Sequence, residues 1–268
     1  MNSRKAIVFL GGGRITRALV AGLRLAHYRR RIVVYDHNPR KLSVLAREAR
    51  VEIARDLKTA IAGAEMLVIA VRPASVAGLL KEVKDTGERE GLCVSLAAGI
   101  PLKNLRTGLS SARWVRAMPS PVCRVGRGLT ALCFDRNARE ADRTRVRGFF
   151  EAVGSVVELP EVQFDVFTAT YSSSHGYHAL AALAAAAGKA GLDRKTALMA
   201  AGHALGDAIL YWRESGLSLE KLLQEAATPG GIAAATMAAM DRTGYARVVA
   251  LGLNAGISRA RQTAKGRG

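Results

Sequence analysis

A short apolar segment that runs directly into three glycines constrains this chain more than any other feature. Residues 5–10, KAIVFL, are rich in residues that favour β-strands, and Gly11, Gly12 and Gly13 follow at once. From Ile15 onward, apolar residues recur with the spacing of a helix. A strand, a glycine turn and a helix in this order begin a βαβ unit, in which the backbone can approach a bound anion closely.

The alternation of strands and helices continues through the first half of the chain. Further strands are predicted at residues 31–36, 65–71, 92–98, 114–119 and 129–134. A helix over residues 39–50 separates the second strand from the third. This order predicts an α/β fold with a Rossmann-type, doubly wound parallel sheet that carries helices on both faces.

The composition changes after about residue 160, where strand-like segments stop. Residues 162–263 are alanine-rich and helical in period, with breaks at residues 188–193, 215–218 and 229–231 and at Gly244. We therefore predict two domains, a dinucleotide-binding Rossmann domain over 1–160 and an all-helical dimerisation and substrate domain over 161–268. Helix faces made of small residues allow close packing against a partner subunit, so we expect a homodimer or a larger homo-oligomer.

Composition and charge exclude several classes of protein. The net charge is +18, which favours anionic ligands, but aromatic residues are only 5% and no basic segment is interleaved with them. We therefore expect a small-molecule substrate and no nucleic-acid partner. No apolar segment reaches the roughly 18 to 20 residues that a membrane span needs, and the N-terminus does not resemble a signal peptide. The expected location is the cytoplasm, without a membrane partner.

The three cysteines give no sign of a metal site or a redox motif. Cys93, Cys123 and Cys133 lack the spacing of zinc ligands and of a CxxC motif. We interpret them as buried thiols and expect no bound metal.

The first glycines have the pattern of a nicotinamide dinucleotide site. Gly11 would form the tight turn and Gly13 would let the pyrophosphate approach the helix, although the usual third small residue is Thr16 here. Asp36, at the end of the second strand, suits the ribose 2′-OH of NAD, whereas His37 and Arg40 suit the 2′-phosphate of NADP. The sequence favours NADP as the cofactor, with NAD as the alternative.

Ordered motifs along nearly the whole chain resemble those of the pyrroline-5-carboxylate reductases. FLGGGRITRAL resembles the family's FIGxGxMAxAL, AVRP at 70–73 resembles AVKP, and VSLAAGI at 94–100 resembles VSIAAGI. VRAMPS at 115–120 and the segment that begins TPGG at 228 also match in order. These enzymes use NAD(P)H to reduce a cyclic imine, pyrroline-5-carboxylate, to L-proline, and the resemblance implies a Rossmann domain followed by a helical dimerisation domain.

The resemblance also assigns residues to the site. Cofactor binding falls on Gly11, Gly13, Arg14, Ile15, Thr16, Asp36, His37, Arg40, Ala70, Val71, Arg72, Pro73, Ala97, Met118 and Pro119. Substrate binding falls on Ser120, Ser172, Ser173, Ser174, Thr228, Gly230 and Gly231.

The chain departs from the family at substrate-facing positions. The family's SGSGPAY becomes YSSSHGY at 171–177, and MPNTP becomes MPSPV at 118–122. In TSPGGTT, which becomes ATPGGIA, the last two threonines are replaced by Ile232 and Ala233, and an alanine cannot donate a proton to an imine nitrogen. His175 and Tyr177 can donate one, so we assign them as the candidate catalytic residues.

Alternatives follow from these departures. The substrate can be pyrroline-5-carboxylate or a different imine or ketone, and a non-catalytic homologue that binds a nucleotide also fits the altered loops. Ser172 or Ser173 can instead cap the following helix, with His175 packed near the surface.

Overall fold

The structure, a computed structural model, describes residues 5–88 and 91–264 of the 268-residue chain. The chain divides into two compact units, Met1–Tyr171 with Gly256–Gly268, and Ser172–Ala255. Helix α7 (Glu161–Thr170) lies in the first unit, the sheet unit, although the sequence assigned it to the helical domain. The exact domain limits stay a prediction.

An eight-stranded sheet forms the first unit in the described residues. Its strands are β1 (Ala6–Leu10), β2 (Ile32–Tyr35), β3 (Glu52–Ile53), β4 (Ala64–Ile69), β5 (Leu92–Ser95), β6 (Arg113–Met118), β7 (Gly128–Phe134) and β8 (Gly154–Glu158). Their order is β3-β2-β1-β4-β5-β6-β7-β8. The predicted Rossmann-type α/β fold is confirmed, and β3 and β8 are edge strands that the sequence did not predict.

One pair of strands corrects the expectation of a parallel sheet. β7 runs antiparallel to β6, with Arg116 opposite Cys133, while the other neighbouring strands are parallel. The short 3₁₀ helix η2 (Pro121–Val125) lies between β6 and β7. Parallel neighbours need a crossover of roughly a dozen residues or more, so this short connection requires the strand to reverse.

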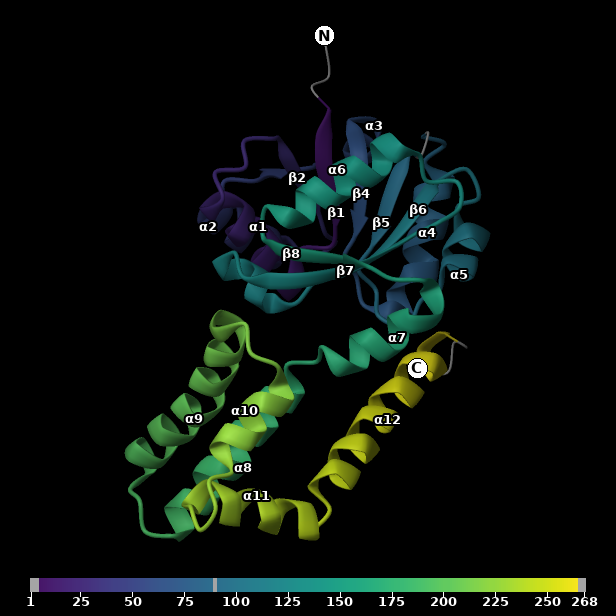
Figure 1. Cartoon of the computed structure of the whole chain (residues 1–268). Coiled ribbons are helices and arrows are strands. Elements are labelled where there is room, and N and C mark those ends of the chain that lie inside the picture. The colour runs from purple at the N-terminus through teal and green to yellow at the C-terminus, as the bar shows by residue number, and fades with distance from the viewer. Residues whose placement is uncertain (1–4, 89–90, 265–268) are drawn as a thin grey trace. The chain divides into compact units, whose positions relative to one another are not determined.

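Helices cover both faces of the sheet (Figure 1). One face carries α1 (Arg14–Leu25), α2 (Pro39–Ala49) and α6 (Glu140–Glu151), and the other carries α3 (Leu57–Ala62), α4 (Val76–Asp85), α5 (Leu102–Gly108) and α7. Alternate residues of β1 point to opposite faces, so Ile7 and Phe9 pack with the first group, while Val8 and Leu10 pack with the second. The two cores are therefore separated by the buried central strands.

Polar side chains fix where several helices begin. Asn38 accepts a hydrogen bond from the Arg40 N–H (3.0 Å) at the start of α2, and Asp56 accepts one from the Thr59 N–H (2.7 Å) at the start of α3. Such caps satisfy N–H groups that have no partner inside the helix. Pro73, which follows Arg72, begins the 3₁₀ helix η1 (Pro73–Ser75) in the same loop as the AVRP motif.

The second unit, which we call the helical unit, confirms the predicted breaks. It contains α8 (Ser174–Lys189), α9 (Arg194–Ser215), α10 (Leu219–Ala226), α11 (Ile232–Arg242) and the first part of α12 (Tyr245–Ala264). Asp193 caps α9 by accepting from the N–H groups of Lys195 and Thr196, and Gly216 ends it in the left-handed conformation.

The helical unit exposes large apolar side chains. Ala197 and Ala201 are its buried apolar residues in the described chain, whereas Ile232 is 89% exposed, Val248 64% and Leu251 61%. A helix that is apolar on several sides is normally buried against another element. The unit therefore has apolar surface that its own helices do not cover.

No helix within residues 5–88 and 91–264 has both the length and the apolar character needed to cross a bilayer.

A buried ion pair joins α6 to the start of β6. Asp142, 3% exposed, accepts from Arg113 Nε (2.6 Å) and Nη2 (3.1 Å) and from the Arg139 N–H (3.1 Å). Burial alone raises the pKa of Asp142, but the hydrogen bonds from Arg113 and Arg139 outweigh it and hold the pKa below its usual value. The carboxylate thus stabilises the fold while it is ionised.

We expect Asp142→Asn to lower the free energy of unfolding at neutral pH by about 2 kcal/mol, because charge-assisted hydrogen bonds are lost. A folded-state pKa below the unfolded value of about 4 stabilises the protein above that pH, and the stabilisation is lost as the pH falls through the folded-state pKa. The difference between variant and wild type should therefore shrink below pH of about 4, which urea titrations at several pH values would measure.

The exposed pair Arg17–Glu48 (2.8 Å) provides a control for this prediction. Both side chains are more than 40% exposed, so Glu48→Gln should change the free energy of unfolding by about 0.5 kcal/mol or less. Equal effects of the two substitutions would contradict a special role for the buried pair.

Candidate functional site

The turn after β1 requires glycine at position 11. Gly11 has a φ of +115°, and a Cβ atom there would lie 2.5 Å from the carbonyl oxygen of Ala70. The Gly11 N–H donates to the Tyr35 carbonyl (2.7 Å), and the hydroxyl of Thr16 donates to the Gly11 carbonyl (2.6 Å). Hydrogen bonds therefore hold the turn on both sides. The side chain of Thr16, which is fully buried, stabilises the turn through its hydroxyl group.

Gly13 opens the start of α1 to a ligand. A Cβ atom added at Gly13 would have no described atom within 4 Å, so this position borders open space. Glycine offers no capping oxygen, which makes the N–H groups of the first turn available to an anion at the positive end of the helix. This arrangement fits a pyrophosphate.

Asp36 connects the glycine turn to the end of β2. Its carboxylate accepts from the N–H groups of Gly12 and Asn38, both at 2.8 Å, and pairs with Lys41 Nζ at 3.2 Å. Burial raises the pKa of Asp36, but these hydrogen bonds and the charge of Lys41 together lower it by more. The net pKa of Asp36 therefore lies below its usual value. An ionised acceptor therefore stands beside a lysine where the adenosine of a dinucleotide would lie.

A cleft of about 1000 Å³ opens at this turn. Eight of the predicted cofactor residues line it: Gly11, Gly13, Arg14, Asp36, His37, Ala70, Val71 and Arg72. It lies where the sheet order changes direction, between β1 and β4, and ligands of open α/β sheets bind at such positions.

The other predicted cofactor residues lie around the cleft. Ile15 packs into the core beneath α1, Arg40 is exposed at the start of α2, and Pro73 lines a neighbouring cavity with Arg72. Ala97 follows β5 and is buried, and Met118 and Pro119 follow one another at the end of β6. Ala97, Met118 and Pro119 lie at or just after the carboxyl ends of strands that share this edge of the sheet with β1.

Sequence reasoning missed part of the cleft wall. Ser75, Gly78 and Glu82 line it from η1 and α4, and Glu82 pairs with His37 (3.3 Å). Their spacing of three and four residues, directly after the AVRP motif, places them on one helical face and could have identified them.

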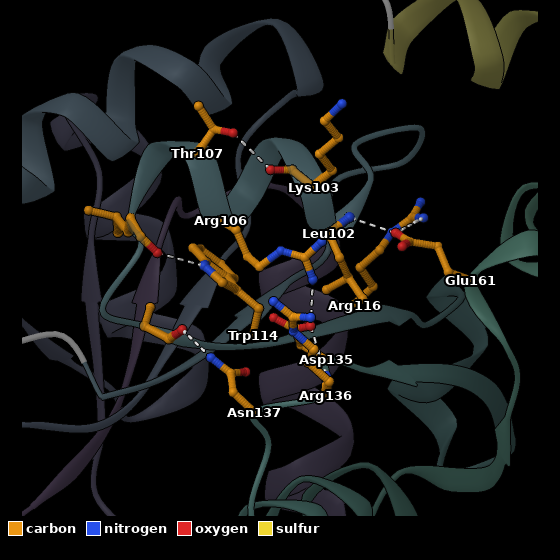
Figure 2. A network of polar contacts seen from close by, with 12 residues as sticks. Leu102, Lys103, Arg106, Thr107, Trp114, Arg116, Asp135, Arg136, Asn137 and Glu161 are labelled. Carbon is orange, nitrogen blue, oxygen red and sulfur yellow. Dashed lines mark hydrogen bonds and ion pairs between the residues drawn. The ribbon is translucent and has the colours of Figure 1, made fainter.

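A network of charged groups fixes the end of β6 relative to α7. The side chain of Arg116 is 2% exposed and reaches Glu161 (3.2 Å) and Asp165 (3.3 Å). Figure 2 shows that Glu161 also accepts from the Leu102 N–H (2.6 Å), so β6, α5 and α7 meet at one carboxylate. The Arg116 guanidinium also lies 4.3 Å from the centre of the Phe164 ring.

Tyr171, directly after α7, is a polar anchor that sequence reasoning did not single out. Its hydroxyl accepts from the Leu129 N–H (2.8 Å) and lies 3.1 Å from the hydroxyl of Ser120. Ser120 in turn accepts from the Val122 N–H (3.3 Å) at the start of η2. The predicted substrate residue Ser120 thus belongs to the sheet unit and is held by Tyr171, the residue after α7.

The other predicted substrate and catalytic residues belong to the helical unit. The hydroxyls of Ser172 and Ser174 lie 2.7 Å apart, and Ser173 occupies the residue before α8, which begins at Ser174. Tyr177 is 71% exposed, and His175, two residues before it, is also exposed.

A tight loop before α11 holds the remaining predicted substrate residues. The Gly231 N–H donates to the Thr228 carbonyl (2.9 Å), and Gly230 between them has a φ of +76°.

The cysteines are buried, as predicted. Burial raises the pKa of Cys123 to about 12 and that of Cys133 to about 11. Neither thiol is therefore a nucleophile near neutral pH.

Two family models match separate parts of the chain. The model described as NADP oxidoreductase coenzyme F420-dependent matches residues 6–99. The model described as pyrroline-5-carboxylate reductase dimerisation matches residues 161–263.

Curated relatives match nearly the full length. The pyrroline-5-carboxylate reductase of Thermus thermophilus is 34% identical over 234 residues, which cover 84% of this chain and 85% of the relative. The enzyme of the same name from Synechocystis is 28% identical over 261 residues, covering 96% of this chain and 97% of the relative.

Solved structures agree with the fold. A pyrroline-5-carboxylate reductase from Coxiella burnetii is 26% identical and superposes with a TM-score of 0.86, covering 97% of this chain and 98% of the other. The NADP-bound pyrroline carboxylate reductase of Plasmodium falciparum, 20% identical, has the same fold with a TM-score of 0.85 and covers 98% and 99% of the two chains. With a relative above 30% identity along most of both chains, this chain belongs to the pyrroline-5-carboxylate reductase family.

Proposed function

We propose that this chain is a cytoplasmic pyrroline-5-carboxylate reductase that uses NAD(P)H to reduce its cyclic imine substrate to proline. The observation that carries the proposal is the cleft at the glycine turn, lined by eight residues that the sequence assigned to a dinucleotide. Membership of the family supports the substrate. When bound, the reduced nicotinamide supplies the hydride that the imine carbon accepts.

Residues of the sheet unit bind and orient the dinucleotide. The N–H groups at the start of α1 hold the pyrophosphate, because Gly13 leaves space beside them. Asp36 and Arg40 bind the adenosine end, and Ala97, Met118 and Pro119 border the nicotinamide.

The family resemblance assigns substrate binding to residues of loops that precede α8 and α11 and to Ser120. In the sheet unit this residue is Ser120, after the end of β6, and in the helical unit the assigned residues are Ser172, Ser173, Ser174, Thr228, Gly230 and Gly231. His175 or Tyr177 donates the one proton that the imine nitrogen takes up. The exposed apolar side chains of the helical unit pack against a second copy of the chain, which gives a homodimer or a larger homo-oligomer.

Gly13→Ala tests the dinucleotide site. Purified wild type should oxidise NADPH or NADH in the presence of pyrroline-5-carboxylate, measured as loss of the absorbance of the reduced nicotinamide. The methyl group of the variant enters the space assigned to the pyrophosphate, so cofactor affinity should fall about tenfold or more, since even one lost charge-assisted hydrogen bond is worth that factor.

Gly148→Ala, on α6, is the matched control, because its added Cβ also has no described neighbour within 4 Å. It should leave cofactor affinity unchanged and slightly raise the stability of the helix. Cofactor binding without turnover of pyrroline-5-carboxylate or any related imine or keto acid would refute the enzymatic proposal.

Arg40→Ala tests the preference for NADPH. If Arg40 holds the 2′-phosphate, its removal should raise the KM for NADPH about tenfold and change the KM for NADH little. Arg47→Ala on the same helix is the control, since the Arg47 side chain is 79% exposed and distant in sequence from the turn. Equal changes for both cofactors would show that Arg40 does not contact the phosphate.

Leu251→Glu tests the assembly. The side chain is 61% exposed in the single chain, and a charge in a buried interface is strongly unfavourable. Analytical ultracentrifugation should show a dimer or larger assembly for the wild type and dissociation for the variant. Leu25→Glu, at a site 60% exposed on the sheet unit, should leave the assembly intact. A monomeric wild type would disprove the assembly.

A further inference from the structure

The hydroxyl groups of Ser120 and Tyr171 form a chain of hydrogen bonds whose direction can be deduced. The Leu129 N–H donates to the Tyr171 oxygen at 2.8 Å, and that oxygen lies 3.1 Å from Ser120 Oγ. The Val122 N–H donates to Ser120 Oγ at 3.3 Å. Two of the three contacts therefore have a fixed donor, because a backbone N–H can only donate.

Either hydroxyl can donate in the contact between Tyr171 and Ser120, and we assign Tyr171 as the donor on chemical grounds. A phenol is a stronger hydrogen-bond donor and a weaker acceptor than an aliphatic hydroxyl, and the Tyr171 oxygen already accepts from Leu129. Ser120 Oγ then accepts from both Tyr171 and Val122, which occupies its two lone pairs. Its single proton is left to be donated to a third group.

Ser120 lies at the edge of the sheet where the cleft opens. It follows the end of β6 by two residues, and β1, β4, β5 and β6 are parallel, so their carboxyl ends lie along the same edge. Three strand spacings of about 4.8 Å place the end of β6 roughly 14 Å from the glycine turn, on the side away from Asp36. In the proposed function this is the nicotinamide side.

The position of Ser120 is rigid. The Cys123 N–H donates to the Ser120 carbonyl (3.1 Å), and η2 lies so close to α1 that a Cβ atom at Gly22 would come within 2.0 Å of the Cys123 carbonyl oxygen. Ser120 itself is 7% exposed. A donor held in this way loses little rotational freedom when it binds an acceptor.

We propose that the Ser120 hydroxyl donates a hydrogen bond to the carboxylate of the substrate, and that Tyr171 is the positioning residue that directs its proton. This inference rests on the proposed function, which supplies an imine that carries a carboxylate. A carboxylate accepts hydrogen bonds throughout the neutral pH range, and the imine nitrogen is already assigned to the proton donors of α8, so the carboxylate is the acceptor left for Ser120.

The test compares pyrroline-5-carboxylate with 1-pyrroline, the same ring imine without the carboxylate. Ser120→Ala should lower kcat/KM for pyrroline-5-carboxylate about 10- to 100-fold, mainly through KM, and leave kcat/KM for 1-pyrroline and the dissociation constant of NADPH unchanged. Ser110→Ala, at an exposed serine of the same unit, should change none of these values.

Tyr171→Phe supplies the second variant, because the phenylalanine keeps the ring that packs 5.4 Å from Phe167. It should lower kcat/KM for pyrroline-5-carboxylate about 2- to 10-fold. In the Ser120→Ala background it should cause no further loss, since it acts through Ser120.

Three results would overturn the inference. Equal losses with the two imines in Ser120→Ala would show that the hydroxyl does not contact the carboxylate, while leaving the proposed function intact. A further loss on adding Tyr171→Phe to Ser120→Ala would show that Tyr171 acts on structure alone. A wild type that reduces neither imine would overturn the inference together with the proposed function.

Discussion

The close approach of the backbone at Gly11 to the Ala70 carbonyl is the constraint on which the site depends. The Gly11 N–H bonds to β2 at Tyr35, and the Ala70 N–H bonds to the Leu10 carbonyl at 2.8 Å, so both neighbours of β1 hold its end. Hydrogen bonds on both sides leave no volume for a side chain, which is why the position must be glycine. After β1 the chain continues into α1, and after β4 it continues into η1. The cleft opens between these two segments, at the point where the strand order reverses.

The helical unit has little apolar core of its own in the described residues. Its helices carry alanine on several faces, and the large apolar side chains between them, such as Leu198 and Tyr211, are more than half exposed in the single chain. Alanine permits close packing but buries little area per residue, so such a unit gains much of its stability from a partner. We therefore expect folding of the helical unit to be coupled to assembly of the oligomer.

The sequence predicted those features of the structure that are determined by interactions between residues close together in the chain. Glycines, caps and helical periodicity act within a few residues, so the turn at Gly11 and the break at Gly244 could be predicted. The reversal of β7 could not be predicted from its apolar pattern, which is the same for either strand direction. Edge strand β3 has only two residues, too few to show a period.

The site shows the same limit. Asp36 was assigned from its place at the end of a strand, but its pairing with Lys41 and the Gly12 N–H depends on how the loop turns back. Tyr171 was missed because its partners are 42 and 51 residues away in sequence. A contact of that kind is fixed by tertiary structure, and a single sequence carries no local sign of it.

The buried charges near α7 are best explained by their role in positioning this helix on the sheet. A buried ion pair adds little net stability, because removing an arginine from water costs about as much as the pairing returns. Arg116 is almost completely buried, yet it contacts Glu161 and Asp165 on successive turns of α7. An apolar side chain would fill that space with less directional preference.

The network therefore fixes the position at which α7 begins on the sheet. Because α7 has ten residues and is about 15 Å long, its fixed start also determines the position of Tyr171, which follows it. Arg116 and Ser120 lie four residues apart at the end of one strand, so the two ends of α7 are tied to the same short segment. A shift of α7 would have to break the contacts to Arg116 and to Ser120 at once, so the loop after β6 is held in a fixed position.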